Sequence, residues 1–115
     1  MGIKARFKVI LSGEVIDFLK GLKPKVQDKI MYNIDKAASL IDPELFKKLD
    51  DTEIWEFRTR YERIQYRLLA FWDKTDGEDT LVIATHGFIK KTQKTPSKEI
   101  ARAEDIRKMY YDNKQ

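Results

Sequence analysis

The sequence predicts a single α+β domain over residues 1–115, in which helices cover one face of a twisted antiparallel sheet. Apolar and polar side chains alternate from Thr52 to Arg60 and from Glu62 to Trp72, which predicts two long strands. Strands with one apolar and one polar face form sheets that are covered on one side only. Segments with helical periodicity precede and follow these strands, which gives the element order β-α-α-β-β-β-α.

The N-terminal part predicts one strand followed by two helices. Side chains alternate from Lys4 to Leu11, and Ser12 is suited to cap the short helix that follows. Pro24 is suited to the first turn of a second helix, which the Asp42-Pro43 pair ends. We expect residues 44–49 to add one further helical turn before the first long strand.

The C-terminal part predicts a hairpin, a last strand and a helix. The Asp76-Gly77 pair is a strong turn signal, and the strand after it is expected from Thr80 to His86. Thr95-Pro96 predicts an N-terminal cap followed by a first-turn proline for a C-terminal helix. The apolar stripe of this helix consists of Ile100, Ala103, Ile106 and Tyr110.

Length and composition restrict the class of protein. A chain of 115 residues can bury a core without covalent staples, and the absence of cysteine excludes a disulfide framework. With one histidine and no cysteine, neither a zinc site nor another cofactor is expected. No apolar run approaches the roughly 18 residues that span a bilayer, so we expect a cytoplasmic protein without membrane contact. The net charge of +4 weakly favours anionic partners.

Two basic clusters indicate a polyanionic ligand. The polar face of the long strands carries four arginines, and the guanidinium fork suits phosphate: Arg58, Arg60, Arg63 and Arg67. The segment 86–96 holds one imidazole and three lysines but no acid: His86, Lys90, Lys91 and Lys94. The alternative is a solvated face, on which the arginines pair with Glu56, Glu62 and the acids of the last helix.

Several blocks of the sequence resemble toxins of the RelE/ParE superfamily, in particular its HigB-like branch, which includes phage-derived proteins of the Gp49 type. The blocks are Leu45 to Leu49, Ile54 to Arg58, Arg63 to Arg67, His86 to Thr92 and Thr95-Pro96, within a resemblance that spans roughly residues 4 to 110. The resemblance implies a RelE-like fold, with two N-terminal helices on one face of the sheet and a C-terminal helix. It also implies the toxin of a type II toxin–antitoxin system, an mRNA endonuclease that acts on the ribosome. Its partners would be the ribosome, mRNA and a helix-turn-helix, HigA-like antitoxin.

Cleavage of RNA without a metal needs a base, an acid and cations that stabilise the phosphorane. The resemblance places Arg63 at the superfamily's arginine near the start of the third strand. It places Lys90 or Lys91 at the basic position after the last strand. A lysine base requires a lowered pKa, and neighbouring arginines act in that direction, whereas His86 needs no shift. The candidate catalytic residues are Arg63, His86, Lys90 and Lys91. The candidate RNA- and phosphate-binding residues are Lys48, Arg58, Arg60, Tyr61, Arg67 and Lys94.

Two other functions stay open. One is a ParE-like inhibitor that poisons gyrase without cleaving RNA, and the other is a phage-derived remnant that binds RNA or its antitoxin without toxicity. The arginine face and the basic strand end favour an endonuclease, because a gyrase poison needs no cluster of phosphate-cleaving groups. For His86, a structural role at a strand end is the alternative to catalysis.

Overall fold

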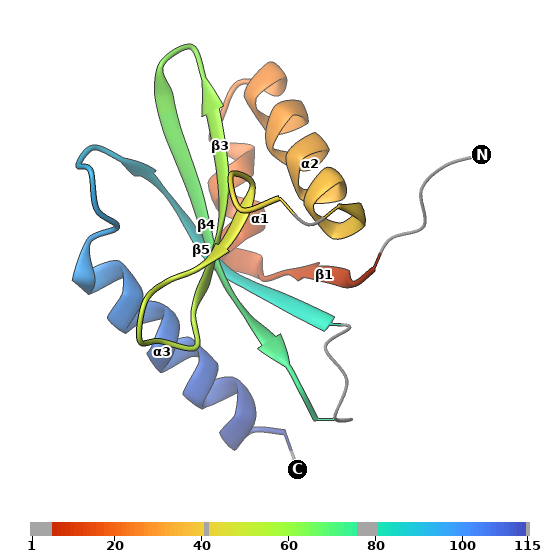
Figure 1. Cartoon of the computed structure of the whole chain (residues 1–115), viewed down its shortest axis with the longest axis vertical. Coiled ribbons are helices and arrows are strands. Elements are labelled where there is room, and N and C mark those ends of the chain that lie inside the picture. The colour runs from red at the N-terminus through yellow and green to blue at the C-terminus, as the bar shows by residue number, and fades with distance from the viewer. Residues whose placement is uncertain (1–5, 41, 76–80, 115) are drawn as a thin grey trace.

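The computed structural model describes residues 6–40, 42–75 and 81–114 and shows a sheet between two helical layers (Figure 1). Within these ranges the sheet has five strands in the order β1-β5-β4-β3-β2. The elements along the chain are β1 (Lys8–Leu11), α1 (Gly13–Lys20), α2 (Pro24–Ser39), β2 (Phe46–Lys48), β3 (Trp55–Tyr61), β4 (Ile64–Asp73), β5 (Leu81–Lys90) and α3 (Ser97–Asp112). The predicted α+β class is confirmed.

The sheet is antiparallel from β2 to β5, whereas β1 lies parallel to β5. Lys8 is paired with Leu81 and Leu11 with Ala84. The first strand therefore forms one edge of the sheet, and its partner strand is distant from it in the sequence. Alternation of side chains predicts a strand but not its partner. The antiparallel arrangement expected from the sequence therefore holds for every described pair except this one.

Helices α1 and α2 pack on one face of the sheet and form the main core with it (Figure 1). Ser12 caps α1 as expected, since its Oγ accepts a hydrogen bond from Val15 N at 3.2 Å, and Pro24 begins α2. The buried residues of this core are Val15, Leu19, Val26, Ile30, Ile34, Ala37, Phe46, Phe57, Tyr66, Leu68, Ala70, Val82 and Ala84. The predicted inward face of the long strands is confirmed, except that Ile64 is 41% exposed.

Helix α3 lies on the opposite face of the sheet (Figure 1). Its Ala103 is buried in a second cluster with Ile54, Leu69, Phe71 and Ile83. The expectation of a fully open polar face was therefore wrong for the part of the sheet beneath α3. In β4 the polar face ends at Arg67, because the next residues on that face are Leu69 and Phe71.

The C-terminal end of α3 is fixed to β4 by Asp73. This carboxylate is buried and accepts hydrogen bonds from Thr75, Tyr110 and Lys114. The hydroxyl of Tyr111 adds a hydrogen bond to Trp72 O at 2.7 Å. No helix in the described ranges is both long and apolar enough to cross a membrane.

Two further elements differ from the expectation. Residues 46–48 form strand β2 rather than a helical turn, because the ring of Phe46 stacks on those of Trp55 and Phe57, with centroids 4.8 and 4.3 Å apart. The last strand does not end at His86 but continues to Lys90. The expected Asp76-Gly77 turn lies outside the described residues.

Candidate phosphate-binding site

A cavity of about 680 Å³ opens where β3, β4 and β5 meet on the polar face and continues around the edge of β3 toward α2. Its lining residues are Asn33, Glu44, Leu45, Arg58, Thr59, Arg60, Gln65, Arg67, Lys90, Lys91, Thr92 and Gln93. The cavity reaches the edge of β3 because β2 is short and pairs only with Trp55 to Phe57.

The strand register places the cations of this cavity next to one another. Arg58 is directly opposite Arg67, and Gln65 lies between Arg60 on one side and Lys90 on the other. Directly opposed residues of antiparallel strands project to the same face, with Cβ atoms about 5 Å apart. Positive side chains from three strands therefore share one small surface.

Arg67 is held rigidly at the floor of the cavity and is 5% exposed. Its Nη1 donates to Tyr66 O and its Nη2 to Gln65 Oε1, both at 3.0 Å. Burial lowers the pKa of Arg67 and Glu56 opposes this effect, but a guanidinium stays protonated in proteins. Arg67 therefore presents a fixed positive charge.

Glu56 lies beneath the arginines and is 2% exposed. Its Oε1 is 3.2 Å from Arg58 Nε and 3.5 Å from Arg67 Nε, and its Oε2 accepts a hydrogen bond from Thr95 Oγ1 at 2.6 Å. The alternative prediction that the arginines pair with Glu56 is confirmed for these two arginines. Glu56 and the lining residue Glu44 are two acids against five cations, so the cavity keeps an excess of positive charge.

Lys90 is the partly buried lysine of the cavity. Burial lowers its pKa, Arg67 and Arg58 lower it further, and Glu56 opposes them. The expectation that neighbouring arginines lower the pKa of a lysine is confirmed for this residue. A lysine in this state accepts and returns a proton more readily near neutral pH than an exposed lysine does. Lys91 is exposed at the rim.

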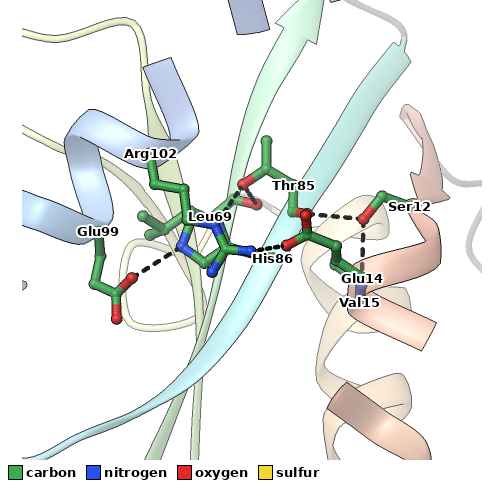
Figure 2. Close-up of polar contacts among 8 residues, drawn as sticks. All are labelled: Ser12, Glu14, Val15, Leu69, Thr85, His86, Glu99 and Arg102. Atoms are coloured by element: carbon green, nitrogen blue, oxygen red, sulfur yellow. Dashed lines mark hydrogen bonds and ion pairs between the residues drawn. The ribbon is translucent and has the colours of Figure 1, made fainter. Parts of the chain in front are cut away.

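His86 lies away from the cavity, buried between the sheet and α3 (Figure 2). Its Nδ1 is 3.0 Å from Thr85 Oγ1 and its Nε2 is 3.3 Å from Glu99 Oε1. Burial lowers the pKa of His86, and Arg102 acts in the same direction. The expected grouping of His86 with Lys90 was wrong, because four residues of extended strand separate them by about 13 Å. Both ring nitrogens face groups of the fold itself, which favours the structural role.

Arg63 is exposed in the tight turn between β3 and β4, and its expected position on the polar strand face was wrong. Glu62 and Arg63 both have positive φ values, 49° and 69°, as a two-residue hairpin turn requires. The strand therefore begins at Ile64, and Arg63 does not line the cavity.

Three other candidate residues also lie outside the cavity. Lys48 is on β2 beside a separate hollow with Asp51, Glu53 and Glu104. Tyr61 packs against the main core, and Lys94 is exposed in the loop after β5. Of the predicted binding and catalytic residues, the cavity brings together Arg58, Arg60, Arg67, Lys90 and Lys91.

Sequence reasoning missed several polar residues of the cavity. Asn33 could have been predicted as a functional residue, because its polar amide side chain lies in the otherwise apolar stripe of α2, next to Ile30 and Ile34. It is buried, and its Nδ2 donates to Thr59 Oγ1 at 3.1 Å. Gln65, Thr92 and Gln93 carry no such signal, because polar residues at strand ends and in loops are ordinary.

Comparisons with known proteins identify a family to which the chain belongs and a solved structure with a similar fold. The family model described as phage-derived protein Gp49-like (DUF891) matches residues 17–108. Among solved structures, the chain is similar to a mutant of the E. coli toxin RelE in the free state. The identity is 14% and the TM-score 0.61, over 89% of this chain and 97% of that chain, so this likeness concerns the fold alone. A search of curated proteins found no significant match.

Proposed function

The chain belongs to the Gp49-like family of phage-derived proteins, and from this family and its RelE-like fold we propose that it is the toxin of a toxin–antitoxin pair and cleaves mRNA on the ribosome. The observation that supports cleavage most strongly is the cavity shared by Arg58, Arg67 and Lys90, in which the lysine pKa is lowered. A phosphate-cleaving site needs fixed cations beside a group that exchanges protons, and these residues offer both.

In the proposed reaction the 2′-hydroxyl of RNA attacks the adjacent phosphorus. The neutral amine of Lys90 removes the hydroxyl proton as the new P–O bond forms. Arg58 donates hydrogen bonds to the phosphoryl oxygens, where negative charge grows in the transition state, and the buried guanidinium of Arg67 adds a fixed positive charge beneath them. The bond to the 5′-oxygen then breaks, and the exposed ammonium of Lys91 protonates this leaving group. The products are a 2′,3′-cyclic phosphate and a 5′-hydroxyl end.

The shape of the site supports dependence on the ribosome. Arg60, Lys91, Thr92 and Gln93 are exposed around the cavity, which provides charge but few buried groups that could read a base. Phosphate contacts position a nucleic acid without specifying its sequence. In this proposal the ribosome therefore holds the message in the cleavable geometry, and naked RNA is cut poorly.

A toxin of this kind requires an antitoxin, which we propose covers the cavity with an acidic segment. Because Arg67 is buried, that segment would contact the exposed parts of Arg58, Arg60 and Lys91 instead. Reversing the charge of Arg60 and Lys91 together should weaken the complex and its salt dependence. Unchanged affinity of this variant would place the antitoxin elsewhere.

The proposed function can be tested by inducing the protein without its antitoxin and mapping the 5′ ends of mRNA. We expect growth arrest and new 5′-hydroxyl ends in translated messages. Lys90→Gln should abolish both effects, whereas Lys108→Gln, an exposed lysine on α3, is the matched control. Growth arrest with intact transcripts and broken DNA would indicate gyrase inhibition. Normal growth at full expression would indicate an inactive remnant.

A further inference from the structure

We propose that Glu56 is the positioning residue of this cavity, joining its two arginines to the loop after β5 and limiting its positive charge. Glu56 does not itself line the cavity, so it acts through its neighbours. Its effect on cleavage rests on the proposed function, whereas its effects on anion affinity and on the loop do not.

The first support is the set of segments that meet at this carboxylate. Arg58 comes from the same strand, Arg67 from β4 and Thr95 from the segment that leads into α3. A carboxylate that is 2% exposed is stable only when charges and hydrogen bonds satisfy it. Removal of the negative charge therefore loosens all three partners at once.

The second support is the hydrogen bond of Thr95. The sequence predicts Thr95 as a helix cap, but α3 begins after Pro96 and has no side-chain cap. The hydroxyl of Thr95 instead donates to Glu56 Oε2 at 2.6 Å. Thr95 ends the loop that supplies Lys91, Thr92 and Gln93 to the cavity. Oε2 of Glu56 thus fixes the loop, while Oε1 faces the arginines.

The third support is electrostatic. Glu56 offsets part of the charge of Arg58, Arg67 and Lys90, so it weakens the attraction of the cavity for any anion. A tighter hold on the substrate alone does not accelerate its reaction, whereas fixed donors aimed at the transition state do. Glu56 therefore lowers ground-state affinity while it maintains the arrangement of cations.

The test compares Glu56→Gln, which keeps the shape of the side chain, with Glu53→Gln, an exposed residue with the same change of charge. Affinity is measured by fluorescence anisotropy with a single-stranded oligonucleotide whose 2′-hydroxyls are absent, so that it cannot be cleaved. We expect Glu56→Gln to bind roughly threefold more tightly, from the loss of one nearby charge. Cleavage of ribosome-bound mRNA at saturation should slow about tenfold to a hundredfold, as for a small misplacement of reacting groups. Glu53→Gln should change neither quantity.

The contribution of the loop is tested with Thr95→Val, which removes the hydroxyl, and Thr95→Ser, which retains it. Amide hydrogen exchange of residues 91–94 should become faster in Thr95→Val and in Glu56→Gln, and cleavage should slow in both. Thr95→Ser should restore both properties. If Glu56→Gln does not fold, the comparison of Thr95→Val with Thr95→Ser still tests the proposal.

Weaker oligonucleotide binding of Glu56→Gln together with a lower melting temperature would overturn the proposal, since a purely structural carboxylate predicts this result. Unchanged loop exchange in Thr95→Val would also overturn it. If the wild-type protein cleaves no mRNA, the proposed function fails separately. The affinity and exchange measurements then still decide the role of Glu56.

Discussion

Under the proposed function, Arg67 and Arg63 are competing candidates for the arginine that stabilises the transition state, and paired substitutions distinguish them. Family resemblance points to Arg63, but the structure places Arg67 in the cavity and Arg63 in the exposed turn. Arg67→Gln and Arg63→Gln each remove one positive charge. The two variants therefore have the same net charge, and a difference between their cleavage rates reports on the position of the lost charge.

The structure predicts different losses of stability for the two substitutions. Arg67→Gln removes two hydrogen bonds of 3.0 Å and an ion pair of 3.5 Å to Glu56. Glu56 keeps Arg58 and Thr95, so the cost to stability should be about 1–3 kcal/mol, less than the several kcal/mol of isolating a buried charge. This corresponds to a melting temperature lower by roughly 4–12 °C. Arg63→Gln should stay within about 0.5 kcal/mol.

Initial rates on ribosome-bound mRNA are compared below both melting transitions, so that the two proteins stay folded. Loss of the fixed positive charge beneath the phosphate should slow cleavage by Arg67→Gln on the order of a hundredfold. Arg63→Gln should cleave at nearly the wild-type rate. A wild-type rate for folded Arg67→Gln would refute the assignment, as would a large loss in Arg63→Gln with unchanged melting.

Three further changes have defined outcomes. Carbon NMR of Lys90 should show a pKa below the ordinary 10.5, because burial and Arg67 lower it, and Arg67→Gln should raise that pKa again. A Lys90 base also predicts a cleavage rate that rises with pH up to this pKa. Gly87→Ala should destabilise the fold by about 1–3 kcal/mol in urea titrations. Its new methyl carbon would overlap with Phe18 Cδ2 and lie 2.7 Å from Leu68 Cδ2, and Phe18→Leu should recover part of the loss. Burial raises the pKa of Asp73, but hydrogen bonds from Lys114, Thr75 and Tyr110 outweigh this effect. They hold the pKa of Asp73 below its ordinary value of 3.8. Asp73 therefore stabilises the protein above about pH 4 and less as pH falls, and Asp73→Asn should flatten this acid limb in thermal melts.

The inward-facing residues and helix positions could be predicted from the sequence because they follow local periodicity. Phe57 and Leu68 face the core, and Arg58 and Arg67 face away from it, as alternation requires. The turn at Glu62 and Arg63 could not be predicted this way, since hairpin turns with two positive φ values usually carry Asn-Gly or Asp-Gly. With Arg63 taken as a residue of the long strand, the alternation of side chains placed it on the polar face with the other arginines, where the structure does not have it.

The remaining errors concern contacts between distant segments. The parallel partner of β1 depends on packing between distant segments, which residue type does not reveal. The cover that α3 gives to the second face of the sheet, including His86, did have a signal in the sequence. Leu69 and Phe71 did indicate that the polar face ends at Arg67, because two large apolar side chains on that face need a cover. This signal would have placed α3 on the second face of the sheet.

The parallel pairing of β1 with β5 also affects the order in which the strands of the sheet can pair during synthesis. The hydrogen bond from Ser12 Oγ to Thr85 O joins residues 73 positions apart, whereas Glu62 and Arg63 alone connect β3 to β4. Closing a long loop costs more entropy and is slower, so the hairpin forms early and β1 joins late. The arginines leave the ribosome before Lys90 and its loop do. Under the proposed function, a nascent chain therefore lacks a working site until β5 and the loop after it have left the ribosome, and the ribosome that makes the toxin is spared until then.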